Sequence, residues 1–71
     1  MVEPKKLAKL YVKEHELRYK AGWNLITDDI KVSVVFDSIV KDTIVNNILI
    51  DAEYLYLVRK EVVYVVEGKY K

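Results

Sequence analysis

The 71-residue sequence contains no cysteine, and this absence excludes disulfides and metal sites built from thiolates. It contains one proline and two glycines, so few positions mark a sharp turn. The longest uninterrupted hydrophobic runs, Tyr54–Val58 and Val62–Val66, have five residues each, whereas a membrane-spanning helix needs about 20. These shortages exclude a disulfide-stabilised domain, a zinc-thiolate domain and a chain that spans a bilayer.

Hydrophobic residues are abundant for so short a chain, at 52% of the total. A chain of this length buries only about 60% of the surface that its unfolded form exposes, so one small core does not hide all of these side chains. We therefore expect a single domain over residues 1–71 that self-associates. The abundance of Lys, Glu, Ile, Val and Tyr, with no Gln, is similar to the composition of proteins from thermophilic organisms.

Charge is distributed unevenly, although the formal net charge is only +1. Residues 1–20 carry six basic and three acidic side chains, residues 28–53 carry two and six, and residues 54–71 carry four and two. A uniformly basic nucleic-acid-binding protein is excluded, so contact with a polyanion is confined to patches. The N-terminal residues lead into an amphipathic pattern instead of an apolar stretch of about 7–15 residues, so we expect no signal peptide and a cytoplasmic location.

The first regular element is predicted to be a helix over residues 4–21. Pro4 suits the first helical position, and Gly22 suits the position just after the end. Apolar side chains at helical spacing predict the buried face: Leu7, Leu10, Tyr11, Leu17 and Ala21. Four lysines fall within an arc of about 60° beside that face, where they either contact phosphates or only keep the helix soluble: Lys6, Lys9, Lys13 and Lys20.

Residues 23–66 are predicted to form about five short strands. Apolar residues occupy every second position from Ile30 to Phe36, and two aspartates just before this run are expected to form a hairpin turn. The segments 53–58 and 61–66 are rich in Tyr and Val, which favour strands. A four-residue spacing of apolar side chains leaves a helix open as the alternative for residues 36–47.

The expected fold class is α+β and mainly β, with an N-terminal helix followed by a strongly bent five-stranded antiparallel barrel. A short basic tail over residues 67–71 completes the chain. Because the C-terminal strands are apolar on both faces, their edges need a partner. Pairing of these edges between subunits predicts a ring.

Two segments resemble the motifs of the Sm-like RNA-binding family. Asn46–Glu53 (NNILIDAE) is similar to the segment in which asparagine precedes aliphatic residues and an acid, and Val58–Val65 (VRKEVVYV) is similar to the aliphatic-Arg-Gly segment that leads into a hydrophobic strand. The order of helix, strand, turn and strand resembles the bacterial branch, Hfq. The resemblance implies a homohexameric ring that acts as an RNA chaperone and holds U-rich single-stranded RNA around its central pore.

The resemblance also implies that RNA is bound by two loops. The first contains Lys41 and Asp42, and the second contains Arg59, Lys60 and Glu61. The chemistry of the side chains favours the same ligand, because cationic groups contact phosphates and amide side chains read bases.

Amide side chains of this kind are present at Asn46 and Asn47, between two apolar runs. An asparagine pair in this position is also typical of a plain turn. Residues 59–61 are likewise typical of a polar hairpin tip, and both interpretations stay open beside the RNA-binding one.

No group of residues typical of an enzyme is found in the sequence. His15 is the only histidine and has no cysteine or second histidine to act with, so we interpret it as a surface or packing residue. The aspartates are spaced as turn residues, and we expect no metal and no cofactor. The prediction is a non-catalytic RNA-binding protein. The alternative is a small homo-oligomeric protein-interaction or structural module with no role in RNA binding.

Overall fold

The computed structural model describes residues 2–45 and 52–70 of the chain. Helix α1 spans Pro4–Tyr19, which confirms the predicted N-terminal helix but ends it two residues early. Lys20 has a backbone φ of 52°, which interrupts the α-helical path, and the short 3₁₀ helix η1 follows over Lys20–Leu25. The glycine predicted to end the helix lies within η1 instead.

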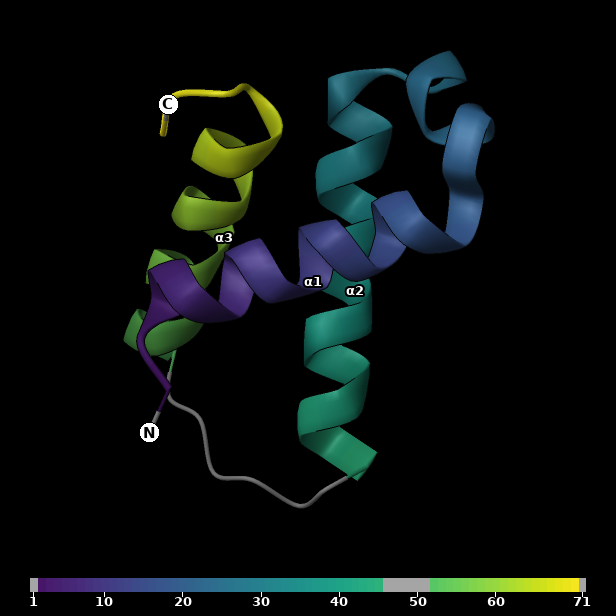
Figure 1. The fold of residues 1–71 in the computed structure, drawn as a ribbon. Helices are drawn as coiled ribbons and strands as arrows, with labels where there is room; N and C mark the ends of the chain where they lie inside the picture. Colours follow the sequence, from purple (N-terminus) through teal and green to yellow (C-terminus); the bar gives the residue numbers. More distant parts are fainter. Residues whose placement is uncertain (1, 46–51, 71) are drawn as a thin grey trace.

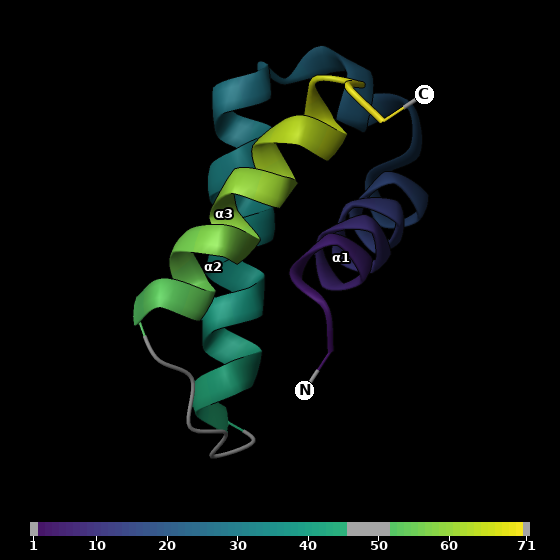
Figure 2. The same cartoon turned by 90° about the vertical axis from the view of Figure 1, so that its left-hand side faces the viewer.

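Helix α2 spans Asp28–Val45, and helix α3 spans Ala52–Val66. Figures 1 and 2 show α2 and α3 as neighbours, with α1 lying across this pair, and α1 packs mainly against α3. The radius of gyration over Cα atoms is 11.8 Å, close to the roughly 11 Å typical of a compact chain of this length. The regular elements in the described ranges are all helical, so the fold class is all-α.

The strands predicted for residues 23–66 are wrong, because the described part of this range forms helices and no strand. The buried side chains of α2 are Val32, Val35 and Ile39, which are three and four residues apart, and the two buried valines of α3 are four apart. A β-branched residue costs a helix about 0.5 kcal/mol, whereas burial of such a side chain contributes about 1.5–3 kcal/mol. Burial on one helical face therefore outweighs β propensity.

The predicted hairpin turn at Asp28 and Asp29 is the first turn of α2. Thr27 precedes it, and the Thr27 Oγ1 accepts a hydrogen bond from the backbone N–H of Ile30 at 3.4 Å. Both carboxylates lie at the positive end of the helix dipole, where negative charge is stabilising. The helical alternative for residues 36–47 is confirmed as far as the end of α2.

The barrel implied by the Sm-like resemblance is also wrong, because the segments that carry the resemblance form helices where the structure describes them. Its second motif, Val58–Val65, is a continuous part of α3, and Ala52 and Glu53 from its first motif begin the same helix. The rest of the first motif, residues 46–51, lies outside the described residues. A ring in which subunits share a sheet needs edge strands, and the described ranges contain none. The predicted Hfq-type ring, which depends on that barrel, is therefore wrong as well.

Helix α1 buries only part of the predicted face, since Leu7 and Tyr11 are half-buried against the core and Ala21 is exposed. Ala8, Val12 and His15 are buried, whereas Leu10 and Leu17 are 55% and 66% exposed. The fully buried alanine presents little bulk to the neighbouring helices, which favours a close approach of α3. The hydrophobic core combines this face with η1, α2 and α3 through Ala8, Val12, Trp23, Val32, Val35, Ile39, Val58 and Val62.

Candidate functional site

Lysine ammonium groups gather around two tyrosine rings on one side of the molecule. The ring centroids of Tyr64 and Tyr70 are 5.8 Å apart, with the ring planes at 56°. The Nζ atoms of two lysines lie 4.2 and 5.5 Å from the Tyr70 centroid, and those of two others lie 6.0 and 5.2 Å from the Tyr64 centroid. We call this group the lysine–tyrosine cluster, and its members are Lys5, Lys9, Lys60, Tyr64, Lys69 and Tyr70.

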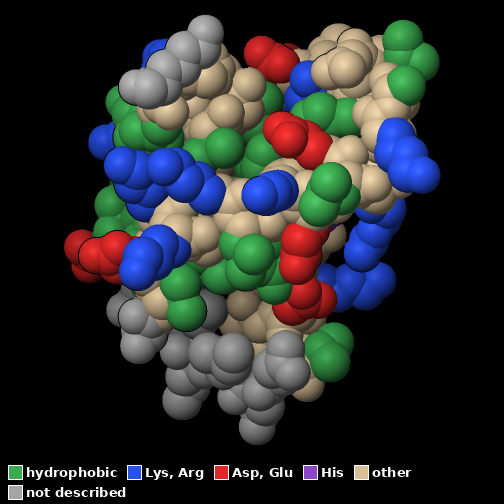
Figure 3. All heavy atoms as spheres, viewed as in Figure 1, with side chains coloured by type: hydrophobic (Ala, Val, Ile, Leu, Met, Phe, Trp, Pro, Cys, Tyr) green, Lys and Arg blue, Asp and Glu red, His purple; other side chains and the backbone are tan. Residues whose placement is uncertain are grey.

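The helices bring four of these residues together. Lys5 and Lys9 lie one turn apart on α1, and Lys60 and Tyr64 lie one turn apart on α3. Because α1 packs against α3, the two pairs meet on one surface. Figure 3 shows Lys and Arg side chains gathered over the N-terminal half of α1.

The motif that ends α3 turns the C-terminal segment back onto the cluster. Gly68 has a φ of 73°, and its N–H donates to the carbonyl of Val65 at 3.1 Å. The N–H of Lys69 donates to the carbonyl of Tyr64 at 2.9 Å. This pair of hydrogen bonds is a Schellman motif, which reverses the chain after a helix. It places Lys69 and Tyr70 against the ring of Tyr64.

Three carboxylates lie beside the four lysines: Glu3, Glu61 and Glu67. The hydroxyl of Tyr70 donates a hydrogen bond to Glu61. This hydrogen bond, followed by desolvation and the charge of Glu61, raises the pKa of Tyr70 to about 12. Lys69 Nζ lies 3.3 Å from a carboxylate oxygen of Glu67. Glu3 lines a hollow with Lys5 and Glu61. Four ammonium groups outnumber these three carboxylates, so the cluster is cationic and favours an anionic ligand.

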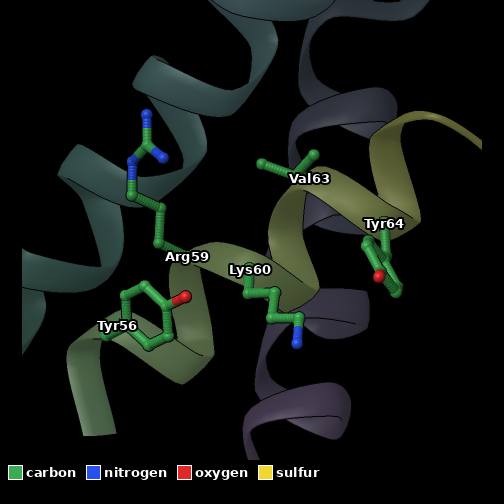
Figure 4. A pocket seen from close by; sticks show the side chains of 5 residues that line it. All are labelled: Tyr56, Arg59, Lys60, Val63 and Tyr64. Carbon is green, nitrogen blue, oxygen red and sulfur yellow. The ribbon is translucent and has the colours of Figure 1, made fainter. Parts of the chain in front are cut away.

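A shallow hollow of about 210 Å³ adjoins the cluster along α3. It is lined by five residues at helical spacing: Tyr56, Arg59, Lys60, Val63 and Tyr64. Tyr56 is 68% exposed, and Figure 4 shows Arg59 extending toward α2 while Lys60 points away from it. Exposed aromatic faces beside cations are typical of surfaces that bind single-stranded nucleic acid.

Two of the lysines predicted to contact RNA, Lys9 and Lys60, belong to the cluster. Lys6 and Lys13 are exposed on α1 but are not members of it. Lys20 borders a separate hollow, beside η1. The predicted lysine face of the helix therefore contributes one residue to the cluster.

The residues implied to form two RNA-binding loops lie in helices instead. Lys41 and Asp42 belong to α2, and residues 59–61 belong to α3. Arg59 and Lys60 line the hollow, and Glu61 accepts the hydrogen bond from Tyr70. Asn46 and Asn47 lie outside the described residues.

Asp42 takes part in a contact between α1 and α2. The hydroxyl of Tyr11 donates a hydrogen bond of 2.7 Å to Asp42 Oδ2. Burial, followed by this hydrogen bond and the charge of Asp42, raises the pKa of Tyr11 to about 12. Asp42 therefore has a structural role in joining α1 to α2. Its negative charge would repel a phosphate.

Four members of the cluster were not predicted from the sequence: Lys5, Tyr64, Lys69 and Tyr70. The available signal was Gly68, since a glycine after an apolar run is typical of a helix C-terminus. The interpretation of residues 61–66 as a strand hid this signal. A helix over these residues places Tyr64 one turn after Lys60. The reversal of the chain after its end brings Lys69 and Tyr70 back toward Tyr64.

His15 is a packing residue, only 4% exposed between α1 and α2. Its Nδ1 lies 2.8 Å from the carbonyl oxygen of Tyr11, and its Nε2 lies 3.2 Å from Ser38 Oγ. Because a carbonyl only accepts, Nδ1 donates to it, and Nε2 is left to accept from the serine hydroxyl. His15 is buried and Ser38 is half-buried, and their contact ties α1 to α2.

Within the described ranges, no group of three or more histidine and acidic side chains is placed to hold a metal ion. The same ranges hold no helix with the length and apolar character needed to cross a membrane. Comparison of the chain with protein-family models, curated proteins and solved structures found no match. The inference of function therefore rests on the geometry of the lysine–tyrosine cluster and its adjoining hollow.

Proposed function

We propose that this protein binds single-stranded RNA on the lysine–tyrosine cluster and the adjoining hollow of α3. The observation that carries the proposal is that four lysine ammonium groups, from α1, α3 and the C-terminal segment, lie within 4.2–6.0 Å of two tyrosine ring centroids. Cations dispersed for solubility alone would not need to converge on aromatic faces.

The chemistry of the cluster supports a single strand more than a duplex. Tyrosine rings stack on bases only when the bases are free of their own stack, and single-stranded loops and ends of RNA present such bases. The ammonium groups pair with the phosphates between them. One ligand therefore satisfies the lysines of the cluster and the ring of Tyr64.

A preference for U-rich RNA rested on the Sm-like resemblance and is not carried into the proposal. Stacking on tyrosine is tolerant of sequence, because every base has an aromatic face. We expect oligouridine and oligoadenosine to bind with affinities of the same order.

The test compares two variants that remove one positive charge each, Lys60→Ala within the cluster and Lys41→Ala outside it. Binding of a fluorescently labelled short oligouridine is followed by anisotropy over a range of salt concentrations. Lys60→Ala is expected to weaken binding severalfold and to reduce the slope of log K against log salt by about 0.7, the loss of one phosphate contact on a single strand. Lys41→Ala is expected to bind like the unmodified protein.

Equal weakening by both variants would show that only overall charge matters, and the cluster would not be the site. Absence of binding by the unmodified protein at low salt would remove the proposal altogether. Circular dichroism of each variant confirms that the helices are retained.

A further inference from the structure

The half-buried ring of Tyr70 is contacted by side chains of the proposed binding surface. The Nζ atoms of Lys5 and Lys9 lie 4.2 and 5.5 Å from its centroid. The centroid of the Tyr64 ring lies 5.8 Å from that of Tyr70. The hydroxyl of Tyr70 donates to the carboxylate of Glu61. A planar group with a hydrogen-bond donor at its edge is thus held between a tyrosine, two cations and one acceptor.

A nucleobase has the features that this position selects. Its ring packs against a tyrosine ring, as the ring of Tyr70 does with its plane at 56° to that of Tyr64, and its N–H groups donate to a carboxylate as the Tyr70 hydroxyl does. The phosphates on either side of such a base carry the charge that Lys5 and Lys9 favour. Tyr70 therefore makes two of the contacts that a base of a bound strand would make, one with the ring of Tyr64 and one with the carboxylate of Glu61.

We propose that Tyr70 occupies a nucleobase subsite in the free protein, and that a base of the bound strand replaces its ring. This inference rests on the proposed function and adds a regulated subsite to it. The C-terminal segment then competes with RNA, and the measured affinity is reduced by the fraction of molecules in which the subsite is filled.

Release of Tyr70 leaves the rest of the fold intact. Its ring lies outside the hydrophobic core, and the segment that carries it follows the end of α3. The Schellman motif at Gly68 holds that segment through two backbone hydrogen bonds. Exchange of the ring for a base therefore requires only local movement.

The experiment titrates a labelled short oligouridine into the unmodified protein, Tyr70→Ala and Tyr70→Phe. None of these changes alters a charge, so long-range attraction of the RNA is the same in all three. Tyr70→Ala is expected to bind roughly threefold tighter or more, because no ring has to be displaced. Tyr70→Phe keeps the ring but loses the hydrogen bond to Glu61, and its affinity is expected to fall between the other two.

Weaker binding by Tyr70→Ala would show that the ring is itself a stacking platform, and equal binding would show that the subsite plays no part; either result overturns the inference. The proposed function is judged separately by Lys60→Ala. If that variant weakens binding while Tyr70→Ala leaves it unchanged, only the subsite is wrong. If none of the proteins binds, both proposals are wrong.

Discussion

Tyrosine hydroxyls join separate parts of this chain through hydrogen bonds to carboxylates and backbone carbonyls. Tyr11 on α1 donates to Asp42 on α2, and Tyr54 on α3 donates to the backbone carbonyl of Val2. In a protein with a thin core, such contacts fix how the helices meet while most of each ring excludes water from the core edge. The sequence does not show which carboxylate or carbonyl each hydroxyl reaches.

Burial of Tyr11, together with its hydrogen bond to Asp42, makes stability depend on pH in the alkaline range. The pKa of Tyr11 is raised to about 12 in the folded protein, against about 10 in the unfolded chain. The folded state therefore holds this proton more tightly, and the resulting stability is complete below pH 10 and is lost as pH rises toward 12. Tyr11→Phe is expected to decrease the slope of unfolding free energy against pH in this window, measured by urea denaturation.

Asp42→Asn serves as the matched variant for this prediction. It keeps an oxygen that accepts the tyrosine hydrogen bond but removes the charge that opposes ionisation, so the slope is expected to be intermediate. An alkaline slope that stays the same in both variants would show that Tyr11 and Asp42 do not titrate as a linked pair.

At the scale of elements, α1 could be predicted from the sequence, but its buried face only in part. Pro4 and the helical spacing identify the helix, and Leu7 and Tyr11 pack against the core as predicted, whereas Leu10 and Leu17 are exposed. His15 is buried only because Ser38 and a backbone carbonyl satisfy its ring nitrogens. That arrangement depends on α2, which lies far along the chain and is invisible to local spacing.

The error in α2 and α3 has a different cause. Their valines and isoleucines satisfy strand alternation and helical spacing at once, so local propensity decided in favour of strands. The packing of α1 across both segments, which no local window contains, selects the helical face. Local signals for helices are the start at Thr27 with the two aspartates that follow it, and Gly68 after the apolar run of α3.

The end of α3 provides a prediction at this scale, because the two glycines of the chain have opposite conformations. Gly68 has a φ of 73°, where an added Cβ is strained, so Gly68→Ala is expected to cost about 1 kcal/mol of unfolding free energy. Gly22 lies in η1 with open space around the position of a Cβ, so Gly22→Ala is expected to be neutral or slightly stabilising. Chemical denaturation followed by circular dichroism measures both, and equal effects would contradict the Schellman assignment.

The whole molecule leaves much of its hydrophobic composition on the surface. Leu10, Leu17, Leu25 and Ile44 are at least half exposed, which agrees with the limited core that so short a chain can build. Self-association, expected from the composition, stays a prediction. What the fold does place together is charge, since residues from both ends of the chain supply the lysines of the cluster.

The central claim is that single-stranded RNA binds where α1, α3 and the C-terminal segment converge. The most direct test is an NMR titration of the isotope-labelled protein with a short oligouridine, in which backbone amide shifts report the contact surface residue by residue. Saturable shifts are expected at Lys5, Lys9, Lys60, Tyr64 and residues 68–70. Shifts centred instead on the end of α2 around Lys41, or no saturable shifts at low salt, would contradict the claim.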